Sequence, residues 1–391
     1  MPTRTKVLLA RTKVLLAMSG GVDSSVAAAL LLRAGYDVVG CFMRLGSPGE
    51  ALEELVEHDA CAATGPATSS LRIGHQGCCS INDAADARLV ASRLGIPFYV
   101  CNFKKDFGRI IDYFVAEYDS GRTPNPCVRC NDWLKFGKLH DYARQIDADF
   151  VATGHYAQVV HDASDGWTLR RGLDRAKDQS YVLFGVPRAR LAHMLLPIGA
   201  MRKPDVRALA RELDLPVGDK PDSQEICFVP DNDYAGLVRS RTHAGVAAGA
   251  IIDASGRTIG EHPGHQHFTI GQRRGVGVAF GRPIYVVDKD PVANTITVGE
   301  RDDLLSTGCT AREANWLIEP PPVDAWRPCA AKIRSHGDPT PARVRRLDET
   351  SFELRFDRPQ FAIAPGQAAV LYDGEIVMGG GWIADAGGRG A

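Results

Sequence analysis

Long apolar runs and a secretory leader are both missing from this chain of 391 residues. No apolar stretch approaches the ~18 residues that a membrane-spanning helix needs. The basic N-terminus is interrupted by charged residues, and it lacks the continuous apolar stretch and small-residue cleavage site of a secretory signal. We therefore expect a cytoplasmic protein with no membrane partner.

Cysteine and net charge are also scarce. Ten cysteines are too few for a disulfide framework in a chain of this length, and in a reducing compartment most would be buried thiols. We interpret five as structural: Cys41, Cys61, Cys101, Cys309 and Cys329. The formal net charge of −1 gives no global sign of nucleic-acid binding, so an RNA surface would have to be local. Residues 165–211 carry ten Lys or Arg and four Asp or Glu, which fits such a surface or a solvated helix face.

The chain is long enough for two or three domains. In its first part, apolar runs alternate with helical patterns, which predicts an α/β fold with a parallel, doubly wound sheet. The expected strands are 14–18, 37–43, 98–101 and 149–153, and the expected helices are 24–33, 81–94, 103–118 and 132–145. After about residue 228 the helical pattern fades and glycines recur among β-branched runs. We predict a catalytic α/β domain over 1–228, a small β-rich connector over 229–304 and a C-terminal β-barrel over 305–391.

A glycine-rich turn joins the first expected strand to the first expected helix. It consists of Ser19, Gly20, Gly21, Val22, Asp23, Ser24 and Ser25. Strand, turn and helix in this order aim backbone N–H groups and a helix N-terminus at an anion. Asp23 could hold Mg²⁺ against bound phosphates, or cap the helix. An ordinary strand–helix turn is the simpler alternative, but the coincidence of all three features favours a phosphate site.

The turn has neither the Gly-Lys-Ser/Thr ending of a Walker motif nor the Gly-x-Gly-x-x-Gly dinucleotide fingerprint. It resembles the pyrophosphatase loop of the N-type ATP enzymes, with their adenine nucleotide α-hydrolase-like fold. GMP synthetase, argininosuccinate synthetase and the tRNA thiolases belong to that group. The resemblance implies that ATP is cleaved between its α- and β-phosphates to adenylate a substrate.

The segment before this loop contains a repeat. Residues 4–10 and residues 11–17 have the same seven amino acids, and only the second copy leads directly into the loop. Residues 1–12 are therefore interpreted as a dispensable extension. We predict that a protein lacking residues 2–10 keeps its ATP-dependent activity; loss of soluble, active protein would contradict this. Residues 45–77 are interpreted as a long surface insertion.

Two further stretches place cysteines in polar surroundings. Residues 123–131 have the sequence Thr-Pro-Asn-Pro-Cys-Val-Arg-Cys-Asn, in which two prolines stiffen an exposed segment. We expect Cys130 at the start of the helix that follows, beside Arg129, with a lowered thiol pKa. A lone cysteine, Cys227, follows the polar run of residues 220–225.

With these residues the chain resembles the tRNA-specific 2-thiouridylase family, whose members thiolate the wobble uridine of certain tRNAs. The resemblance extends from about residue 13 to about residue 383. Its motifs are the glycine-rich loop, Cys78-Cys79-Ser80, and residues 123–126, 152–156, 177–181, 221–228 and 269–273. It implies that the uracil C2 oxygen is adenylated, that a cysteine persulfide or hydrosulfide then attacks C2, and that pyrophosphate and AMP are released.

The resemblance also implies the site residues, ligands and partners. Cys227 would carry the persulfide, and Cys130 would release sulfide from it or close a disulfide with it. The ATP pocket would be lined by Ala17, Met18, Ser19, Gly20, Gly21, Val22, Asp23, Ser24, Met43 and Gly154. The target base and the tRNA would be contacted by Asn125, Pro126, Cys127, His155, Lys177, Asp178, Gln179 and Gln367. Expected ligands are ATP and Mg²⁺; expected partners are tRNA and a sulfur-relay protein or cysteine desulfurase that donates persulfide sulfur.

Several alternatives accompany this interpretation. Cys127 stands where many family members carry Asp, so we assign it no acid/base role. Cys127 and Cys130 could form half of a zinc site or a redox pair, but no second Cys-x-x-Cys exists. An iron–sulfur cluster on Cys127, Cys130 and Cys227 is a further alternative that we do not favour. His155 could be an ordinary core histidine.

Two other functions fit the ATP loop. One is an adenylating ligase or amidotransferase, which would not need Cys130 and Cys227. The other is a non-catalytic RNA-binding protein with a relict loop, which pyrophosphate release that depends on tRNA would exclude.

Overall fold

The computed structural model describes residues 12–46, 81–221, 228–229, 234–241, 247–278 and 281–387. Four features predicted from the sequence lie partly or wholly outside these residues: the N-terminal extension, most of the 45–77 insertion, Cys78-Cys79 and Cys227. Within the described residues, no helix combines the length and apolar character needed to cross a membrane.

The first part of the chain is built on a five-stranded sheet in the order β3-β2-β1-β4-β7, with all neighbours parallel. Its strands are β1 (Lys13–Ala17), β2 (Asp37–Arg44), β3 (Phe98–Asn102), β4 (Phe150–Ala152) and β7 (Met194–Leu195). Leu15 and Leu16 of β1 are both buried but belong to different core clusters. Successive side chains of a strand point to opposite faces, so both faces of the sheet are covered. The predicted doubly wound α/β fold is confirmed.

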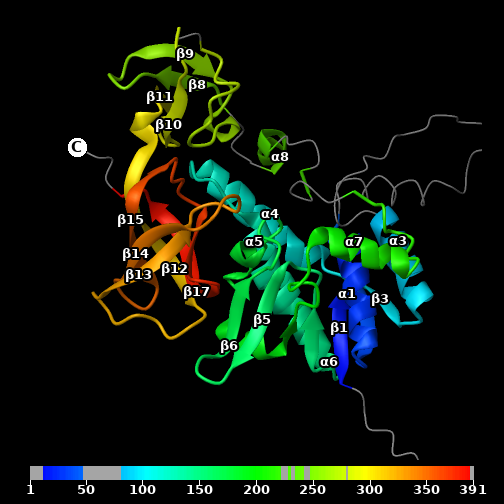
Figure 1. The fold of residues 1–391 in the computed structure, drawn as a ribbon. Helices are drawn as coiled ribbons and strands as arrows, with labels where there is room; N and C mark the ends of the chain where they lie inside the picture. Colours follow the sequence, from blue (N-terminus) through cyan, green and yellow to red (C-terminus); the bar gives the residue numbers. More distant parts are fainter. Residues whose placement is uncertain are drawn as a thin grey trace, which may run out of the picture.

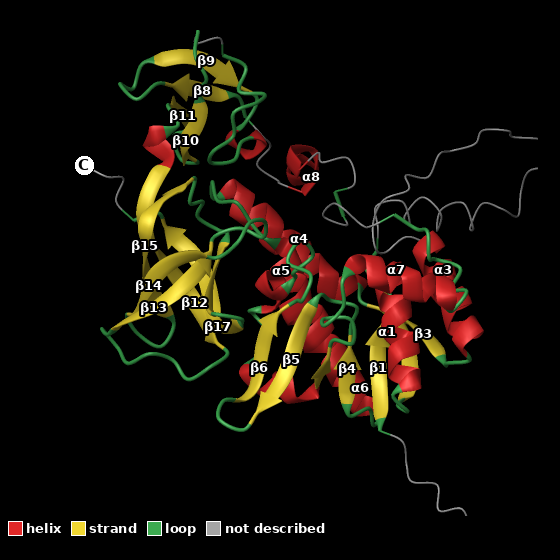
Figure 2. Cartoon of the chain, viewed as in Figure 1, coloured by secondary structure: helices red, strands yellow, loops and turns green. Residues whose placement is uncertain are grey.

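Helices cover the two faces of this sheet (Figures 1 and 2). One cluster joins the sheet to α1 (Val22–Arg33), α3 (Ile81–Leu94) and α7 (Lys203–Glu212). The other joins it to α4 (Lys104–Asp119), α5 (Pro126–Arg129), a π-helix (Cys130–Lys138) and α6 (Leu139–Gln145). Short 3₁₀ helices follow at Ser180–Leu183 and Arg188–His193.

The helix expected over 132–145 differs from the prediction at its start. The structure begins the helix at Pro126, and Asn125 caps it by accepting a hydrogen bond from the Val128 N–H at 3.4 Å. Proline is favoured at the first helical position because its missing N–H has no partner there, and asparagine is a preferred cap. Cys130 is therefore one turn inside the helix, and Cys127 occupies the first turn.

Two β-rich parts follow. A four-stranded sheet has the order β10-β11-β8-β9, with β8 (Gly249–Ile252), β9 (Thr258–His262), β10 (Tyr285–Asp290) and β11 (Thr295–Gly299). It comes after α8 (Tyr234–Arg241), and short 3₁₀ helices lie at His265–His267 and Asp302–Leu304.

The C-terminal strands close into the predicted β-barrel, because β12 pairs with both β15 and β17. Its strands are β12 (Leu305–Trp316), β13 (Trp326–Lys332), β14 (Thr340–Arg346), β15 (Ser351–Phe361), β16 (Ala368–Asp373) and β17 (Ile376–Asp385). The hairpin of β5 (Ala157–Asp162) and β6 (Gly166–Arg171) extends this sheet through β17. The barrel is thus joined to the first part of the chain by strand pairing, and the three domain boundaries stay a prediction.

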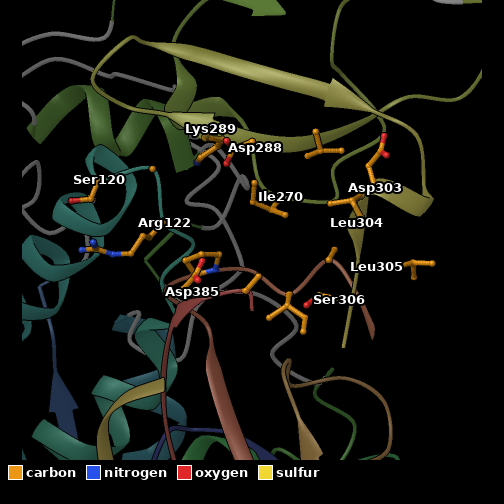
Figure 3. Close-up of a pocket in the computed structure, with 16 residues that line it drawn as sticks. Ser120, Arg122, Ile270, Asp288, Lys289, Asp303, Leu304, Leu305, Ser306 and Asp385 are labelled. Carbon is orange, nitrogen blue, oxygen red and sulfur yellow. The ribbon is translucent and has the colours of Figure 1, made fainter. Parts of the chain in front are cut away.

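A cavity of about 190 Å³ lies where the three parts meet (Figure 3). Its walls include Arg122 after α4, Lys289 on β10 and Ser306 on β12. None of the site residues predicted from the sequence lines it. The cavity therefore belongs to the domain junction rather than to the nucleotide site.

Candidate active site

The conformation of the glycine-rich loop depends on Gly20 and on hydrogen bonds at the start of α1. Gly20 has φ +71°, and a Cβ there would clash with the backbone oxygen of Asp83, so only glycine fits. The Ser24 and Ser25 hydroxyls donate to the Gly21 carbonyl at 3.2 and 2.8 Å. Gly21 is the N-cap of α1, and no side chain of the described residues caps this helix. No side-chain cap therefore competes with an anion for the first N–H groups of α1.

Asp23 does not cap α1. Its carboxylate instead contacts two side chains from distant parts of the sequence, Lys203 and Tyr156. Lys203, at the start of α7, places its Nζ 2.8 Å from both carboxylate oxygens of Asp23. The Tyr156 hydroxyl donates to Oδ1 of the same carboxylate at 2.7 Å. The side chain of Lys203 is only 10 % exposed, so the ion pair with Asp23 offsets the cost of removing its ammonium from water.

Lys203 was missed in the sequence, although one signal was available. It stands in the first turn of α7, where the helix dipole disfavours a positive charge. A second lysine, Lys220, also contacts the loop. Its Nζ donates to the Gly20 carbonyl at 3.1 Å and to Asp83 and Asp86 at 2.6 Å each. Two lysines thus contact the loop, Lys203 at the Asp23 carboxylate and Lys220 at the Gly20 carbonyl.

Gly154 and Met43 lie at the same edge of the sheet as the loop. A Cβ on Gly154 would come within 2.7 Å of the Ser24 nitrogen, so this glycine permits direct packing of the backbone after β4 on the loop. Met43 is near the carboxyl end of β2, two residues past the Ala17–Cys41 pair. Ligands of open parallel sheets bind at this edge, so the structure brings the predicted nucleotide residues together.

His155 links this edge to the cysteine-bearing helix. Its Nε2 lies 3.5 Å from the Lys135 ammonium, which has only donors, so Nε2 accepts and Nδ1–H donates to Thr153 Oγ1 at 2.7 Å. Burial, and secondarily the charge of Lys135, holds the pKa of His155 well below its usual range. The histidine is neutral and buried, as in the core-histidine alternative, and its contact with tRNA stays a prediction.

The two thiols of this helix differ in exposure. Cys127 is exposed in the first turn, and Cys130 is half-buried one turn later, on the same side of the helix. Asn131 ties this turn to the segment after β6, because its Nδ2 donates to the carbonyls of Cys127 and Val182 at 3.1 and 3.2 Å. The turn that carries both cysteines is therefore bonded to the core through Asn131, while the Cys127 side chain is exposed to solvent.

Most of the residues expected to touch tRNA make contacts within the protein. The Asp178 carboxylate accepts from Gly172 N–H and pairs with Arg171, with its side chain 1 % exposed. Gln179 accepts the Tyr156 N–H at 2.9 Å. The Gln367 amide donates to the carbonyls of Thr123 and Pro124 at 3.2 Å each. The side chain of Lys177 is exposed, and its backbone N–H donates to the Asp174 carbonyl at 3.1 Å.

Asp132, in the first turn of the π-helix, is a titratable group that the sequence did not single out. Burial raises its pKa to about 6, against the opposing charges of Arg129 and Arg190. Folding therefore favours the protonated carboxyl, and this group lowers stability progressively as pH rises from about 4 to about 6.

We predict that Asp132→Asn raises the free energy of unfolding at pH 7.5 by roughly 1 to 2 kcal/mol, after a discount for partial exposure. The gain should shrink toward pH 4. Thermal unfolding across pH checks this, with the exposed Asp112→Asn as control. An unchanged or lower melting temperature at pH 7.5 would contradict the pKa assignment.

Comparison with known proteins places this architecture in a family. Residues 12–231 match the tRNA methyl transferase HUP domain, residues 241–300 the tRNA methyl transferase PRC-barrel domain, and residues 306–383 the aminomethyltransferase beta-barrel domain. The tRNA-specific 2-thiouridylase MnmA of Rhodopirellula baltica is 48% identical, over 96% of this chain and 97% of its own length. The proteins of the same name from Carboxydothermus hydrogenoformans and Clostridioides difficile are 46% and 43% identical, over 96% and 95% of this chain and 98% of each relative. This chain belongs to the tRNA-specific 2-thiouridylase family.

Proposed function

We propose that this protein is a sulfurtransferase that replaces the C2 oxygen of the tRNA wobble uridine with sulfur, at the cost of ATP cleavage to AMP and pyrophosphate. One observation carries the proposal beyond the family match. A chain of contacts runs from the π-helix through Lys135 to His155, and its neighbour Gly154 packs on Ser24 of the loop. The phosphate site therefore lies next to the helix that carries Cys127 and Cys130, which is formed by α5 and the π-helix and is called the cysteine helix below. A site that combines adenylation with sulfur transfer requires this proximity.

The adenylation step uses the loop and its lysine. Uracil O2 attacks the α-phosphorus of ATP, and the bond to the β-phosphate oxygen breaks to release pyrophosphate. The N–H groups of α1 and the Lys203 ammonium stabilise the negative charge that develops on the phosphates. The Lys203 ammonium lies near the N–H groups of α1, because it is 2.8 Å from Asp23 in the first turn of that helix.

Magnesium is a less direct fit at Asp23. Both oxygens of that carboxylate already accept hydrogen bonds, two from Lys203 and one from Tyr156. A metal ion bound there would first have to displace the ammonium. In this arrangement the Asp23 carboxylate serves as the partner of Lys203 and Tyr156 rather than as a metal ligand.

The sulfur step uses two thiols. The terminal sulfur of a Cys227 persulfide adds to C2, the Cys130 thiolate attacks the Cys227 sulfur, and the S–S bond breaks with its electron pair moving to the sulfur on C2. AMP leaves with the former O2. The products are 2-thiouridine, AMP and a Cys130–Cys227 disulfide, which a thiol reductant must reopen. A sulfur-relay protein or cysteine desulfurase would reload Cys227.

The iron–sulfur alternative makes a different prediction. Among the described residues, no three metal-ligating side chains lie close enough to hold an ion, and a cluster would need Cys227 together with Cys127 and Cys130. Iron content and visible absorbance of anaerobically purified protein separate the two mechanisms, since the persulfide route needs neither.

Pyrophosphate release tests the proposed adenylation. We expect release from ATP to rise at least ~10-fold when substrate tRNA is added, because uracil is the nucleophile. A synthetic tRNA with cytidine at the wobble position is the matched control and should give no increase. Release that ignores tRNA, or that needs ammonia or an amino acid instead, would favour a ligase or amidotransferase.

A further inference from the structure

Arg129 lies between Cys127 and Cys130 in the sequence, and its side chain enters a box of aromatic rings. Its guanidinium carbon is 4.3 Å from the ring centre of Trp382, 5.0 Å from that of Trp133 and 5.1 Å from that of Tyr113. Trp382 belongs to barrel strand β17, whereas the other two rings come from the π-helix and α4. The side chain is 12 % exposed. The barrel therefore forms one wall of the box around a residue of the cysteine helix.

The barrel also supplies the nearer of two acidic partners of Arg129, the other being Asp132 at 4.0 Å. Glu313 on β12 accepts a hydrogen bond from Arg129 Nη2 at 2.7 Å. Its backbone has φ +51°, and the pairing of β12 with β17 shifts register between Arg312 and Asn315. Bulges of this kind re-aim a side chain, and a non-glycine residue at positive φ costs free energy. The strained bulge thus directs Glu313 toward the cysteine helix.

A second contact holds the same segment from the barrel side. The Thr123 N–H donates to the Pro365 carbonyl at 2.8 Å, and Gln367 donates to the carbonyls of Thr123 and Pro124. The cysteine helix is therefore attached to the barrel before its first residue and again at Arg129. Stacked, desolvated arginine contacts are stronger than exposed ion pairs.

We infer that Arg129 is a positioning residue through which the C-terminal barrel orients Cys127 and Cys130, an inference that rests on the proposed function. A guanidinium enclosed by three rings and bonded to Glu313 restricts the rotation of the turn that carries both thiols. The barrel then contributes to the sulfur-transfer site through its contacts with Arg129 and with residues 123–124.

The test compares Arg129→Met with a matched control, Arg109→Met. Arg109 lies over the same Trp133 ring at 5.1 Å but is exposed. We expect Arg129→Met to lower kcat for tRNA thiolation about 10- to 100-fold with little change in KM for ATP or tRNA. Arg129→Lys should recover only part of the loss, because it restores charge without the planar stack. Arg109→Met should retain wild-type kcat.

A second readout needs neither ATP nor tRNA. Alkylation rates of Cys127 and Cys130, followed by mass spectrometry, should change at least about threefold in Arg129→Met, while that of Cys329 in the barrel stays constant. Glu313→Ala is the backup variant if Arg129→Met does not fold, and it should shift the same rates in the same direction. Wild-type alkylation rates and kcat in a folded variant would overturn the inference. If the wild-type protein fails to thiolate tRNA, the proposed function fails, and the alkylation rates still decide the positioning role.

Discussion

Replacement of Lys203 by methionine is expected to lower pyrophosphate release in the presence of tRNA by about 100- to 1,000-fold, the usual effect of removing a charge-stabilising group. The variant loses the ammonium beside the phosphates. It also leaves the Asp23 carboxylate, 31 % exposed, without its ammonium partner at the loop, where its negative charge repels ATP. Both effects act in the same direction, so KM for ATP should rise as kcat falls.

The Asp23–Lys203 pair gives this prediction a sharp internal check. If repulsion by Asp23 contributes, Asp23→Asn combined with Lys203→Met should recover part of the activity, and the two effects should be non-additive. Lys105→Met, which removes an exposed lysine of α4, is the control for charge loss alone. Unchanged pyrophosphate release in Lys203→Met would contradict both effects, the stabilisation of the phosphates by the ammonium and the repulsion of ATP by Asp23.

Serine at Cys130 or Cys227 is expected to abolish 2-thiouridine formation while tRNA-dependent adenylation persists. Serine cannot carry a persulfide or attack one, but it leaves the phosphate loop intact. The readouts are 2-thiouridine per tRNA and pyrophosphate per enzyme, measured in the same reaction. Full activity of Cys227→Ser would favour an adenylating ligase or amidotransferase.

Cys329 is the matched control for these cysteine variants. It is half-buried on β13, where burial raises the pKa of its thiol to about 12, so it is not a nucleophile at neutral pH. Cys329→Ser should retain wild-type thiolation. A loss there equal to that of Cys130→Ser would indicate that serine substitution damages the fold rather than the chemistry.

Local pattern was sufficient for most of the first part of the fold. The strands and helices expected there appear within a few residues of their predicted ends, because burial on a covered sheet imposes apolar runs that a sequence displays directly. The Ser-Gly-Gly loop was found for the same reason: strand, turn and helix are adjacent in the chain. The predicted start of the cysteine helix is wrong. The prolines of residues 123–126 indicate a stiff exposed segment, whereas Asn125 is the helix cap and Pro126 the first helical residue.

The contacts that were missed join distant parts of the chain. Lys203 and Asp23 are 180 residues apart, and Arg129 and Glu313 are 184 residues apart. No local periodicity reports such pairs, and the bulge that aims Glu313 depends on the register of two barrel strands. The same limit applies to Gln367, whose amide turns toward the segment before the cysteine helix rather than remaining free at the surface.

Mass analysis of tRNA nucleosides tests the central claim most directly. The tRNA is incubated with the protein, ATP and a persulfide donor, digested to nucleosides and compared with a reaction lacking ATP. Sulfur transfer to C2 predicts a nucleoside in which one oxygen of the wobble uridine is replaced by sulfur, formed only when ATP is present. An unchanged uridine, or a mass gain that corresponds to any other group, would contradict the assignment.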